Sequence, residues 1–401
     1  MKNTFLPLVI LLSTSFIQAQ EAPSQSRDFG TCIADFQDQA RSESISEHVV
    51  ENVLGNLEEQ VRVIELDNSQ PEFVQTFAHY LNLRVSDTRI ERGRALYQEN
   101  REFLAELTEI YGVPGQYLVA FWGLETNFGS YLGNTPTLDS LATLACDPRR
   151  SAFFTSELMV ALQLVERDSL DPAEMQGSWA GAVGHTQFMP SSYWHYAVDG
   201  DGDGQINLWA SEKDALASGA NFLQSLGWNR EERWGREVQL PDDFAYLETG
   251  LRNSAPLSDW SDLGVRRADG SELPIADVEG SILVPAGHEG PAFLVYDNFS
   301  VIMRWNRSES YAISVGHLAD RILGGGGLIS PPSEDQLALT RSQLLGLQNA
   351  LVEQGYDPGT PDGVMGPATR GALSAFQRDS GLIADGFPNQ ASIDRLGLQL
   401  P

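Results

Sequence analysis

The chain has 401 residues, of which 42% are hydrophobic, and its 55 acidic residues outnumber 26 basic ones to give a formal net charge of -29. A chain of this length and apolar content is expected to fold into two or three domains with proper cores, which excludes a disordered protein. The acidic excess excludes nucleic acid as a partner, because nucleic acid requires a basic surface, and it disfavours binding to anionic lipid headgroups.

The N-terminal residues have the pattern of an export signal. Lys2 supplies a positive start, residues 5–17 form an apolar stretch too short to span a bilayer, and Ala19 is a small residue at which cleavage can occur. We therefore predict a signal peptide over residues 1–19 and a mature protein that is soluble in the periplasm. No other long apolar run follows, so no stable membrane anchor is expected.

Cys32 and Cys146 are the two cysteines of the chain. Because an exported protein folds in an oxidising compartment, we expect them to form a disulfide; two buried thiols are the alternative. The chain has no CxxC pair and no Cys/His cluster, so neither cysteine is expected to act as a nucleophile or as a metal ligand.

The spacing of apolar residues predicts a mainly α-helical protein. Between residues 234 and 296, however, turn residues alternate with short runs such as Ser281-Ile-Leu-Val and Phe293-Leu-Val-Tyr, which predict a small β-rich insert. Helices are expected on both sides of the insert, within residues 36–112, 153–167, 215–226 and 298–322.

Glu125 follows eight residues with few polar groups, of which seven carry apolar side chains and the eighth is Gly123. A carboxyl group in such surroundings loses solvation of its charged form, so its pKa is expected to rise. A glutamate with a raised pKa can give a proton to a poor leaving group near neutral pH, which is the task of a general acid. The alternative is a glutamate at a helix end that points to water.

A second segment, residues 178–193, combines small residues with uncharged hydrogen-bonding groups and flat aromatic faces. Glycine and alanine allow a ligand to approach the backbone closely, and the mixture suits a neutral, hydroxyl-rich ligand such as a sugar chain. A tightly packed corner between a helix and a loop is the alternative. The candidate hydrogen-bonding side chains are those of Ser178, His185, Gln187 and Tyr193.

Three motifs, taken in order, resemble the signatures of one enzyme family. They are Gly123-Leu-Glu-Thr-Asn-Phe-Gly129, Ser178-Trp-Ala-Gly-Ala-Val-Gly-His-Thr-Gln-Phe-Met-Pro190 and Trp305-Asn-Arg-Ser-Glu-Ser-Tyr-Ala312. The set resembles that of the family B murein lytic transglycosylases, the membrane-bound lytic transglycosylase B type, over most of residues 30–325. The resemblance implies a lysozyme-like helical core that cleaves the glycan strands of peptidoglycan.

The resemblance also assigns roles to individual residues. Glu125 matches the single catalytic acid of the family. Ser178, Gln187 and Asn306 match positions that line its sugar cleft. Trp305 stands where the family pattern leads us to expect tyrosine, and we count it among the substrate-binding residues together with Tyr193.

The resemblance implies a cleavage in which no water is consumed. Glu125 protonates the oxygen of the β-1,4 bond between N-acetylmuramic acid and N-acetylglucosamine, and the N-acetyl group stabilises the developing cation. The ionised Glu125 then removes the proton of the muramic acid 6-hydroxyl as that oxygen closes on C1, which gives a 1,6-anhydro sugar. In the motifs no second acidic residue recurs near Glu125 in the sequence, which disfavours a hydrolytic muramidase. A non-catalytic wall-binding scaffold is the other alternative.

Residues 199–207 reproduce the first nine positions of an EF-hand-like calcium loop. Alternating carboxylates repel one another unless a cation lies between them, so we expect a structural Ca²⁺, or Na⁺ in saline surroundings, within residues 199–214. Its affinity should be modest because position 12 is Ala210. No organic cofactor is expected. The expected ligands are Asp199, Asp201, Asp203, Gln205 and, by resemblance to the family, Asp214, with Glu212 as its competitor.

Residues 339–401 resemble the peptidoglycan-binding module that is found beside wall hydrolases. The apolar residues around Leu347 and Phe376 predict a small three-helix core. The module contains no cluster of His or Cys, so we expect it to bind the wall and to perform no chemistry.

Glycines 324–327 and a Pro-Pro pair predict a flexible linker over residues 326–338. Such a linker would hold a catalytic domain, residues 20–325, at a high local concentration near the wall. We expect a monomer whose partners are peptidoglycan strands, with other wall enzymes as further candidates.

Overall fold

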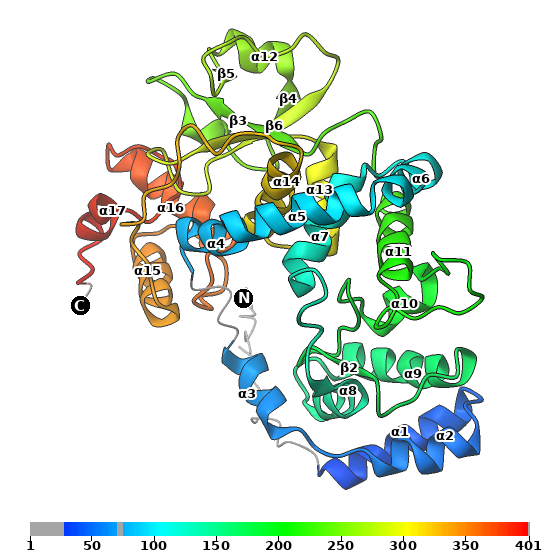
Figure 1. Cartoon of the computed structure of the whole chain (residues 1–401). Helices are drawn as coiled ribbons and strands as arrows, with labels where there is room; N and C mark the ends of the chain where they lie inside the picture. Colours follow the sequence, from blue (N-terminus) through cyan, green and yellow to red (C-terminus); the bar gives the residue numbers. More distant parts are fainter. Residues whose placement is uncertain (1–27, 70–74, 400–401) are drawn as a thin grey trace, which may run out of the picture.

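The computed structural model describes residues 28–69 and 75–399 (Figure 1). The predicted signal peptide, residues 1–19, lies outside these ranges. Within them the chain is mainly helical, as predicted, with one two-stranded and one five-stranded sheet. None of the helices in the described part is both long and apolar enough to cross a bilayer.

Eleven α-helices precede the β-rich insert in the described part of the chain. Several begin at a hydroxyl side chain that accepts a hydrogen bond from the first turn, as Ser86 does from the backbone N–H of Arg89. They are α1 (Phe29–Ser42), α2 (Glu47–Asn52), α3 (Val61–Ser69), α4 (Phe77–Arg84), α5 (Asp87–Glu99), α6 (Arg101–Tyr111), α7 (Gly115–Thr126), α8 (Thr137–Cys146), α9 (Ser151–Arg167), α10 (Pro190–Tyr196) and α11 (Glu212–Ser225), with the short 3-10 helix η1 (Leu54–Asn56).

Two large apolar clusters divide this helical body. One holds α1 and α2 against α8 and α9, which lie together at one end of the molecule in Figure 1. The other gathers α4 to α7 with α11 and the two helices that follow the insert. Helix α7 is apolar on nearly all sides and buried along most of its length, as expected for a helix enclosed by other elements.

The β-rich insert is an antiparallel sheet with strand order β4-β6-β7-β3-β5. The strands predicted around Ser281 and Phe293 are its central strands β6 and β7. Because side chains alternate along a strand, Phe293 packs into the helical body while its neighbour Leu294 packs into the separate core of the insert. The elements are β3 (Gly235–Gln239), β4 (Ser254–Pro256), β5 (Arg266–Arg267), β6 (Glu279–Leu283), β7 (Ala292–Val295), α12 (Leu257–Asp262) and η3 (Tyr246–Glu248).

The segment predicted as one helix over residues 298–322 is two helices, α13 (Asp297–Trp305) and α14 (Glu309–Ile322). The backbone of Asn306 is extended, and the Ser308 hydroxyl starts α14 by accepting a hydrogen bond from the N–H of Tyr311. Because of this break, α13 and α14 run in different directions.

The C-terminal module has the predicted three-helix core, formed by α15 (Arg341–Glu353), α16 (Pro367–Asp379) and α17 (Gln390–Arg395). A buried glutamine on each of the first two helices holds the loop that follows. Gln348 accepts hydrogen bonds from the N–H groups of Asp362 and Gly363.

The linker is held against the catalytic part of the chain, unlike the flexible tether expected from its glycines. The Glu237 carboxylate on β3 accepts the backbone N–H groups of Ile329 and Ser330, both at 2.8 Å. The C-terminal module also contacts the insert: Nδ1 of His288, between β6 and β7, lies 2.6 Å from Oδ2 of Asp385, whose side chain is fully buried in the module. Backbone donors of a glycine-rich segment can be satisfied by a neighbouring carboxylate, which composition does not reveal.

The expected disulfide is absent. Cys32 and Cys146 are buried thiols in the cluster that joins α1 to α8. They pack there as small apolar side chains, which is the alternative that the sequence left open.

A two-stranded sheet, β1 (Thr135–Pro136) and β2 (Gln176–Gly177), brings the segment after α7 beside the glycine-rich segment that begins at Ser178. This pairing joins two of the three sequence motifs.

Candidate active site

The end of α7 is fixed by an unusual run of backbone conformations. The helix ends at Thr126, because Asn127 and Phe128 have left-handed backbones with φ of 49° and 59°. Such conformations cost energy in residues other than glycine and are retained where the surroundings enforce them. The Thr126 hydroxyl donates to the carbonyl of His185 at 2.9 Å and accepts the N–H of Gly129.

Glu125, at this fixed end, is half-buried and accepts two hydrogen bonds on the same oxygen. The Trp305 indole donates Nε1–H to Oε1 at 2.9 Å, and the Tyr311 hydroxyl donates to Oε1 at 2.5 Å. The donors come from the end of α13 and the start of α14, so the break between these helices places both on one carboxylate. Trp305, predicted to bind substrate, therefore contacts the predicted catalytic acid itself.

Tyr311 is a site residue that the sequence analysis did not single out. It lies within the third motif, and its place in that motif was the only available signal. Burial, followed by the neighbouring Glu125, raises the pKa of Tyr311 well above its ordinary value, so the hydroxyl stays protonated and remains a donor.

Aromatic rings enclose the Trp305 side of the site. The Trp305 ring lies 4.4 Å from that of Phe121, 5.4 Å from Phe188 and 5.3 Å from Phe222, measured between ring centroids. This packing fixes the indole, and the indole in turn fixes the carboxyl plane of Glu125. Since Oε1 already accepts two donors, a proton on the carboxyl group is expected on Oε2.

His185, whose role the sequence left undetermined, supports the same region. Its Nδ1 accepts the Nε1–H of Trp122 at 2.9 Å, so a neutral ring carries its proton on Nε2. Burial lowers the pKa of His185, which favours that neutral form. A Cβ atom at Gly129 would lie 2.3 Å from the His185 ring, so the glycine lets the two segments touch.

Ser178 and Gln187 lie on one loop and also hold it together. The Ser178 hydroxyl accepts the N–H of Ala182 at 3.1 Å. Gln187 has a left-handed backbone, and its Nε2 donates to the carbonyls of Leu132 and Gly184, both at 3.0 Å. These bonds tie the loop to the segment that follows α7. Asn306, half-buried and extended, lies next to Trp305.

Tyr193 does not line the site. Its side chain is fully buried, and its hydroxyl donates to the carbonyl of Ile206 at 2.7 Å. Burial raises the pKa of this phenol. The expected contact with substrate is therefore not supported, because the hydroxyl that suggested it is used to hold the acidic loop.

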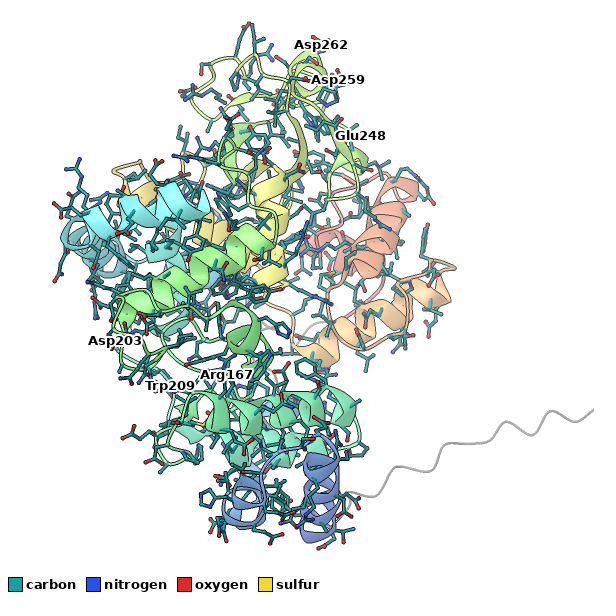
Figure 2. All side chains as sticks on the ribbon, turned by 90° about the vertical axis from the view of Figure 1, so that its right-hand side faces the viewer. Arg167, Asp203, Trp209, Glu248, Asp259 and Asp262 are labelled. Atoms are coloured by element: carbon teal, nitrogen blue, oxygen red, sulfur yellow. The ribbon has the colours of Figure 1, made fainter. Side chains whose placement is uncertain are left out.

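The acidic loop brings Asp199, Asp201 and Asp203 together. One carboxylate oxygen from each lies within 4.8 Å of the others, and all three residues are exposed. Figure 2 shows Asp203 at the outer edge of the molecule, away from the acidic residues Asp259 and Asp262 of the insert. Asp199 accepts the N–H groups of two loop glycines, which curves the backbone around the three carboxylates.

Asp214 has a different place from the one expected. It is 2% exposed and is not part of the group of three carboxylates. Its Oδ1 accepts the N–H of Gly200 and its Oδ2 accepts the N–H of Asn207, both at 2.8 Å. Asp214 therefore closes the loop from the start of α11. Gln205 is exposed within the loop, beside Asp203.

The fold and the site define a lysozyme-like helical protein with one carboxyl group held at the end of a buried helix. Residues 28–320 match the family described as transglycosylase SLT domain, and residues 340–396 match a peptidoglycan binding domain. The chain belongs to the SLT-domain transglycosylases, and the family B resemblance of its motifs is confirmed.

Known relatives agree with this assignment. The chain is 32% identical to membrane-bound lytic murein transglycosylase B of Escherichia coli K12 over 251 residues, which cover 59% of this chain and 65% of that protein. It resembles the crystal structure of SltB3 from Pseudomonas aeruginosa in complex with NAG-NAM-pentapeptide, with a TM-score of 0.89, 40% identity and coverage of 92% of this chain and 100% of that one.

A third relative bears on the acidic loop. The Escherichia coli lytic transglycosylase Slt35 in complex with calcium has a TM-score of 0.65 and 28% identity, over 73% of this chain and 93% of that one.

Proposed function

We propose that this protein is a peptidoglycan lytic transglycosylase that cleaves the β-1,4 bond between N-acetylmuramic acid and N-acetylglucosamine and leaves 1,6-anhydromuramoyl ends. The observation that carries the proposal is the Glu125 carboxyl group, held at the end of α7 by the Trp305 indole and the Tyr311 hydroxyl. A binding protein has no need of a carboxyl group fixed in this way. Membership in the family and the named relatives give further support.

In the proposed reaction Glu125 acts first as an acid and then as a base. Oε2 carries the proton, because Oε1 accepts from Trp305 and Tyr311. Glu125 gives this proton to the bridging oxygen, and the bond from that oxygen to C1 of the muramic acid breaks. The N-acetyl group stabilises the cation at C1. The carboxylate then takes the proton of the 6-hydroxyl while O6 bonds to C1, so the proton returns to Glu125 and no water enters.

The surrounding residues position the sugar. Asn306 follows Trp305 directly, and the loop with Ser178 and Gln187 is tied to the segment after α7. Their amide and hydroxyl groups match the hydroxyl and N-acetyl groups of the strand. Trp305 acts on the substrate chiefly through Glu125.

Mass spectrometry of the muropeptides released from purified peptidoglycan tests the proposal. Products one water lighter than hydrolysed fragments carry 1,6-anhydro ends and support it. Products with ordinary reducing ends would make the protein a muramidase and would require a second group to activate water. Binding to the wall with no release would make it a scaffold.

We propose further that the acidic loop binds Ca²⁺ through Asp199, Asp201 and Asp203, with Gln205 as a further ligand. The chemistry fits, since hard oxygen donors suit this ion and three carboxylates within 4.8 Å repel one another without a cation. The calcium complex of Slt35 supports the choice of ion. Asp214 shapes the loop, as its buried hydrogen bonds to Gly200 and Asn207 indicate.

We also propose that residues 1–19 direct export and that the protein acts in the periplasm. The catalytic unit would span residues 20–325, and residues 339–401 would bind the wall. The apolar stretch at residues 5–17 supports export, and the match of residues 340–396 supports wall binding. Sequencing the N-terminus of the protein purified from the periplasmic fraction tests both the cleavage point and the compartment.

A further inference from the structure

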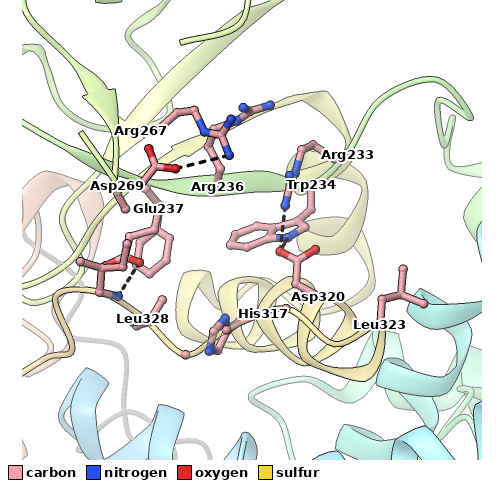
Figure 3. Close-up of a pocket in the computed structure, with 16 residues that line it drawn as sticks. Arg233, Trp234, Arg236, Glu237, Arg267, Asp269, His317, Asp320, Leu323 and Leu328 are labelled. Atoms are coloured by element: carbon pink, nitrogen blue, oxygen red, sulfur yellow. Dashed lines mark hydrogen bonds and ion pairs between the residues drawn. The ribbon is translucent and has the colours of Figure 1, made fainter. Parts of the chain in front are cut away.

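A pocket lies between the β-rich insert, the C-terminal part of α14 and the beginning of the linker (Figure 3). Its walls carry three arginines, Arg233, Arg236 and Arg267, although the whole chain has a net charge of -29. The arginines surround an aromatic and aliphatic floor that includes Trp234, Phe293 and Leu328.

The three arginines are unequally neutralised. Arg233 forms an ion pair with Asp320 at 2.9 Å, whereas the pair between Arg267 and Asp269 is 3.8 Å long and loose. Arg236 forms no ion pair with any residue in the described ranges, and its Nε is buried without a hydrogen-bond partner there. Burial lowers the pKa of Arg236, and Arg233 and Arg267 lower it further, while the neighbouring Tyr296 acts in the opposite direction. The guanidinium carbon of Arg236 lies 5.7 Å from the centre of the Tyr296 ring, but no carboxylate pairs with it in the described part of the chain, and a partly buried guanidinium without such a partner favours an anion as neighbour.

The pocket also holds three acidic residues, each of which already has partners, and Asp269 accepts the N–H and the hydroxyl of Ser271 besides its loose pair with Arg267. Both oxygens of Glu237 accept backbone N–H groups of the linker, at Ile329 and Ser330. Oδ2 of Asp320 accepts from the Trp234 indole as well as from Arg233. The remaining titratable group, His317, is buried, and burial lowers its pKa to about 4, so it is neutral at pH 7.

The linker leaves the pocket open to a ligand. Glycines 325–327 form part of its lining, and a Cβ atom at Gly326 would meet nothing within 4 Å. A side chain of a bound molecule can therefore pass the backbone of the linker closely.

The pocket is distinct from the site at Glu125. Asp320 follows Tyr311 by nine residues on α14, which corresponds to a rotation of about 180° and an advance of about 14 Å. Tyr311 binds Glu125 on one side of the helix, and Asp320 and His317 line the pocket on the other. A ligand in the pocket is thus separated from the bond that Glu125 would cleave.

We propose that this pocket binds the terminal carboxylate of a peptidoglycan stem peptide, one that does not belong to the sugar in the cleft. The guanidinium groups of Arg236 and Arg267 match a carboxylate in shape and charge, and the apolar floor suits the small side chain of a terminal alanine. The choice of a wall peptide rests on the proposed function. The pocket would hold a neighbouring strand while the cleft acts on another.

Calorimetric titration of the full-length protein with a free stem pentapeptide tests the proposal, with the same peptide as its C-terminal amide for comparison. We expect the free acid to bind, and both amidation and Arg236→Gln to weaken binding by about tenfold or more, as for loss of a charged hydrogen-bonding pair. Arg252→Gln, an exposed arginine elsewhere on the insert, is the matched control and should leave the affinity unchanged.

Equal binding of the acid and the amide, or full affinity in Arg236→Gln, would overturn the proposal, as would the absence of any binding. Inorganic phosphate is a second probe. If phosphate binds in an Arg236-dependent way and the peptide does not, the pocket is an anion site for a different ligand and the peptide assignment is wrong.

The proposed function is measured separately, by the anhydro ends that the wild-type protein releases from purified peptidoglycan. Absence of these ends would contradict the transglycosylase assignment and leave the peptide affinity as measured. Loss of the peptide affinity alone would contradict only the pocket.

Discussion

The site at Glu125 and the acidic loop both depend on carboxylates, but their surroundings give the same chemical group opposite tasks. Glu125 is half-buried at the end of an apolar helix and takes hydrogen bonds from two uncharged aromatic side chains. Asp199, Asp201 and Asp203 are exposed, close together, and bonded to backbone N–H groups. The first arrangement suits the transfer of a proton, and the second suits the binding of a cation.

The difference originates in the local sequence. Around Glu125 the apolar residues of α7 exclude water, and its donors arrive from helices far along the chain. In the loop, glycines with left-handed backbones, such as Gly202 and Gly204, turn the chain so that alternate carboxylates converge. Apolar and aromatic residues thus surround the single carboxyl group of Glu125, whereas glycines allow the loop to turn so that three carboxylates lie close together.

Removing the Glu125 carboxyl group should have the largest effect. Glu125→Gln keeps the shape and can still accept hydrogen bonds from Trp305 and Tyr311, but it can neither give nor take the proton. Because one residue performs both transfers, we expect release of anhydromuropeptides to fall by about a thousandfold or more. The measurement is the rate of product release from purified peptidoglycan.

Glu102→Gln, an exposed glutamate on α6, is the matched control and should keep full activity. Thermal unfolding of Glu125→Gln should resemble that of the wild type. Substantial cleavage by Glu125→Gln would show that Glu125 is not the general acid.

His317 is a buried titratable group on α14, and burial is the main cause of its lowered pKa, followed by the neighbouring Arg321. Its pKa is lowered to about 4 from 6.5. As pH falls below 6.5 the unfolded chain binds the proton first, so stability drops until the folded protein is also protonated near pH 4. We expect the wild type to lose about 3 kcal/mol more than His317→Gln between pH 7 and pH 4.

Urea unfolding of both proteins across this range measures the difference. His79→Gln, at an exposed histidine, is the control and should follow the wild-type curve. If the free energy of unfolding of His317→Gln and of the wild type changed equally with pH, burial would not lower the pKa of His317 as expected.

The sequence predicted the parts of the site that depend on local pattern. An apolar run that ends on a glutamate placed Glu125 at the end of a buried helix, and alternating aspartates placed three carboxylates together. The mainly helical content followed from periodicity in the same way, whereas the lysozyme-like core was implied by the resemblance of the motifs to a known family. Each feature that the local pattern predicted is set by residues that are close in the chain.

The parts that depend on distant contacts could not be predicted. Trp305 and Tyr311 reach Glu125 across 180 and 186 residues, through a helix break that periodicity concealed. Tyr193 was expected in the cleft because its hydroxyl can bind sugar, but the carbonyl of Ile206 uses that hydroxyl. Asp214 was expected as a metal ligand by resemblance to the family, and its oxygens accept the backbone N–H groups of Gly200 and Asn207.

Removing one donor to Glu125 should have a smaller effect than removing the acid. Tyr311→Phe deletes the hydroxyl that binds Oε1 and leaves the Trp305 bond in place. A hydrogen bond to a group that becomes charged is worth about 2 kcal/mol, so we expect the cleavage rate to fall about thirtyfold. The pH profile of the rate should shift as well, since the donor favours the ionised carboxylate.

Tyr97→Phe, a half-buried tyrosine on α5, is the comparison variant. An unchanged rate and pH profile in Tyr311→Phe would mean that the Trp305 indole alone orients Glu125.

Removing calcium should lower the stability of the protein more than its cleavage rate. Of the effects predicted here, this change in stability should be the smallest. At a Ca²⁺ concentration ten times Kd, binding to the folded state contributes about 1.4 kcal/mol, and this contribution should disappear with chelator. Asp203→Asn should have the same effect as chelator and should make the melting temperature insensitive to added Ca²⁺. Asp262→Asn, which changes an exposed acid of the insert by the same one charge, should keep the calcium response (Figure 2). If the melting temperature of Asp203→Asn still rises with added Ca²⁺, the ion binds at another place. The carboxylates of the acidic loop would then not have the role that distinguishes them from Glu125.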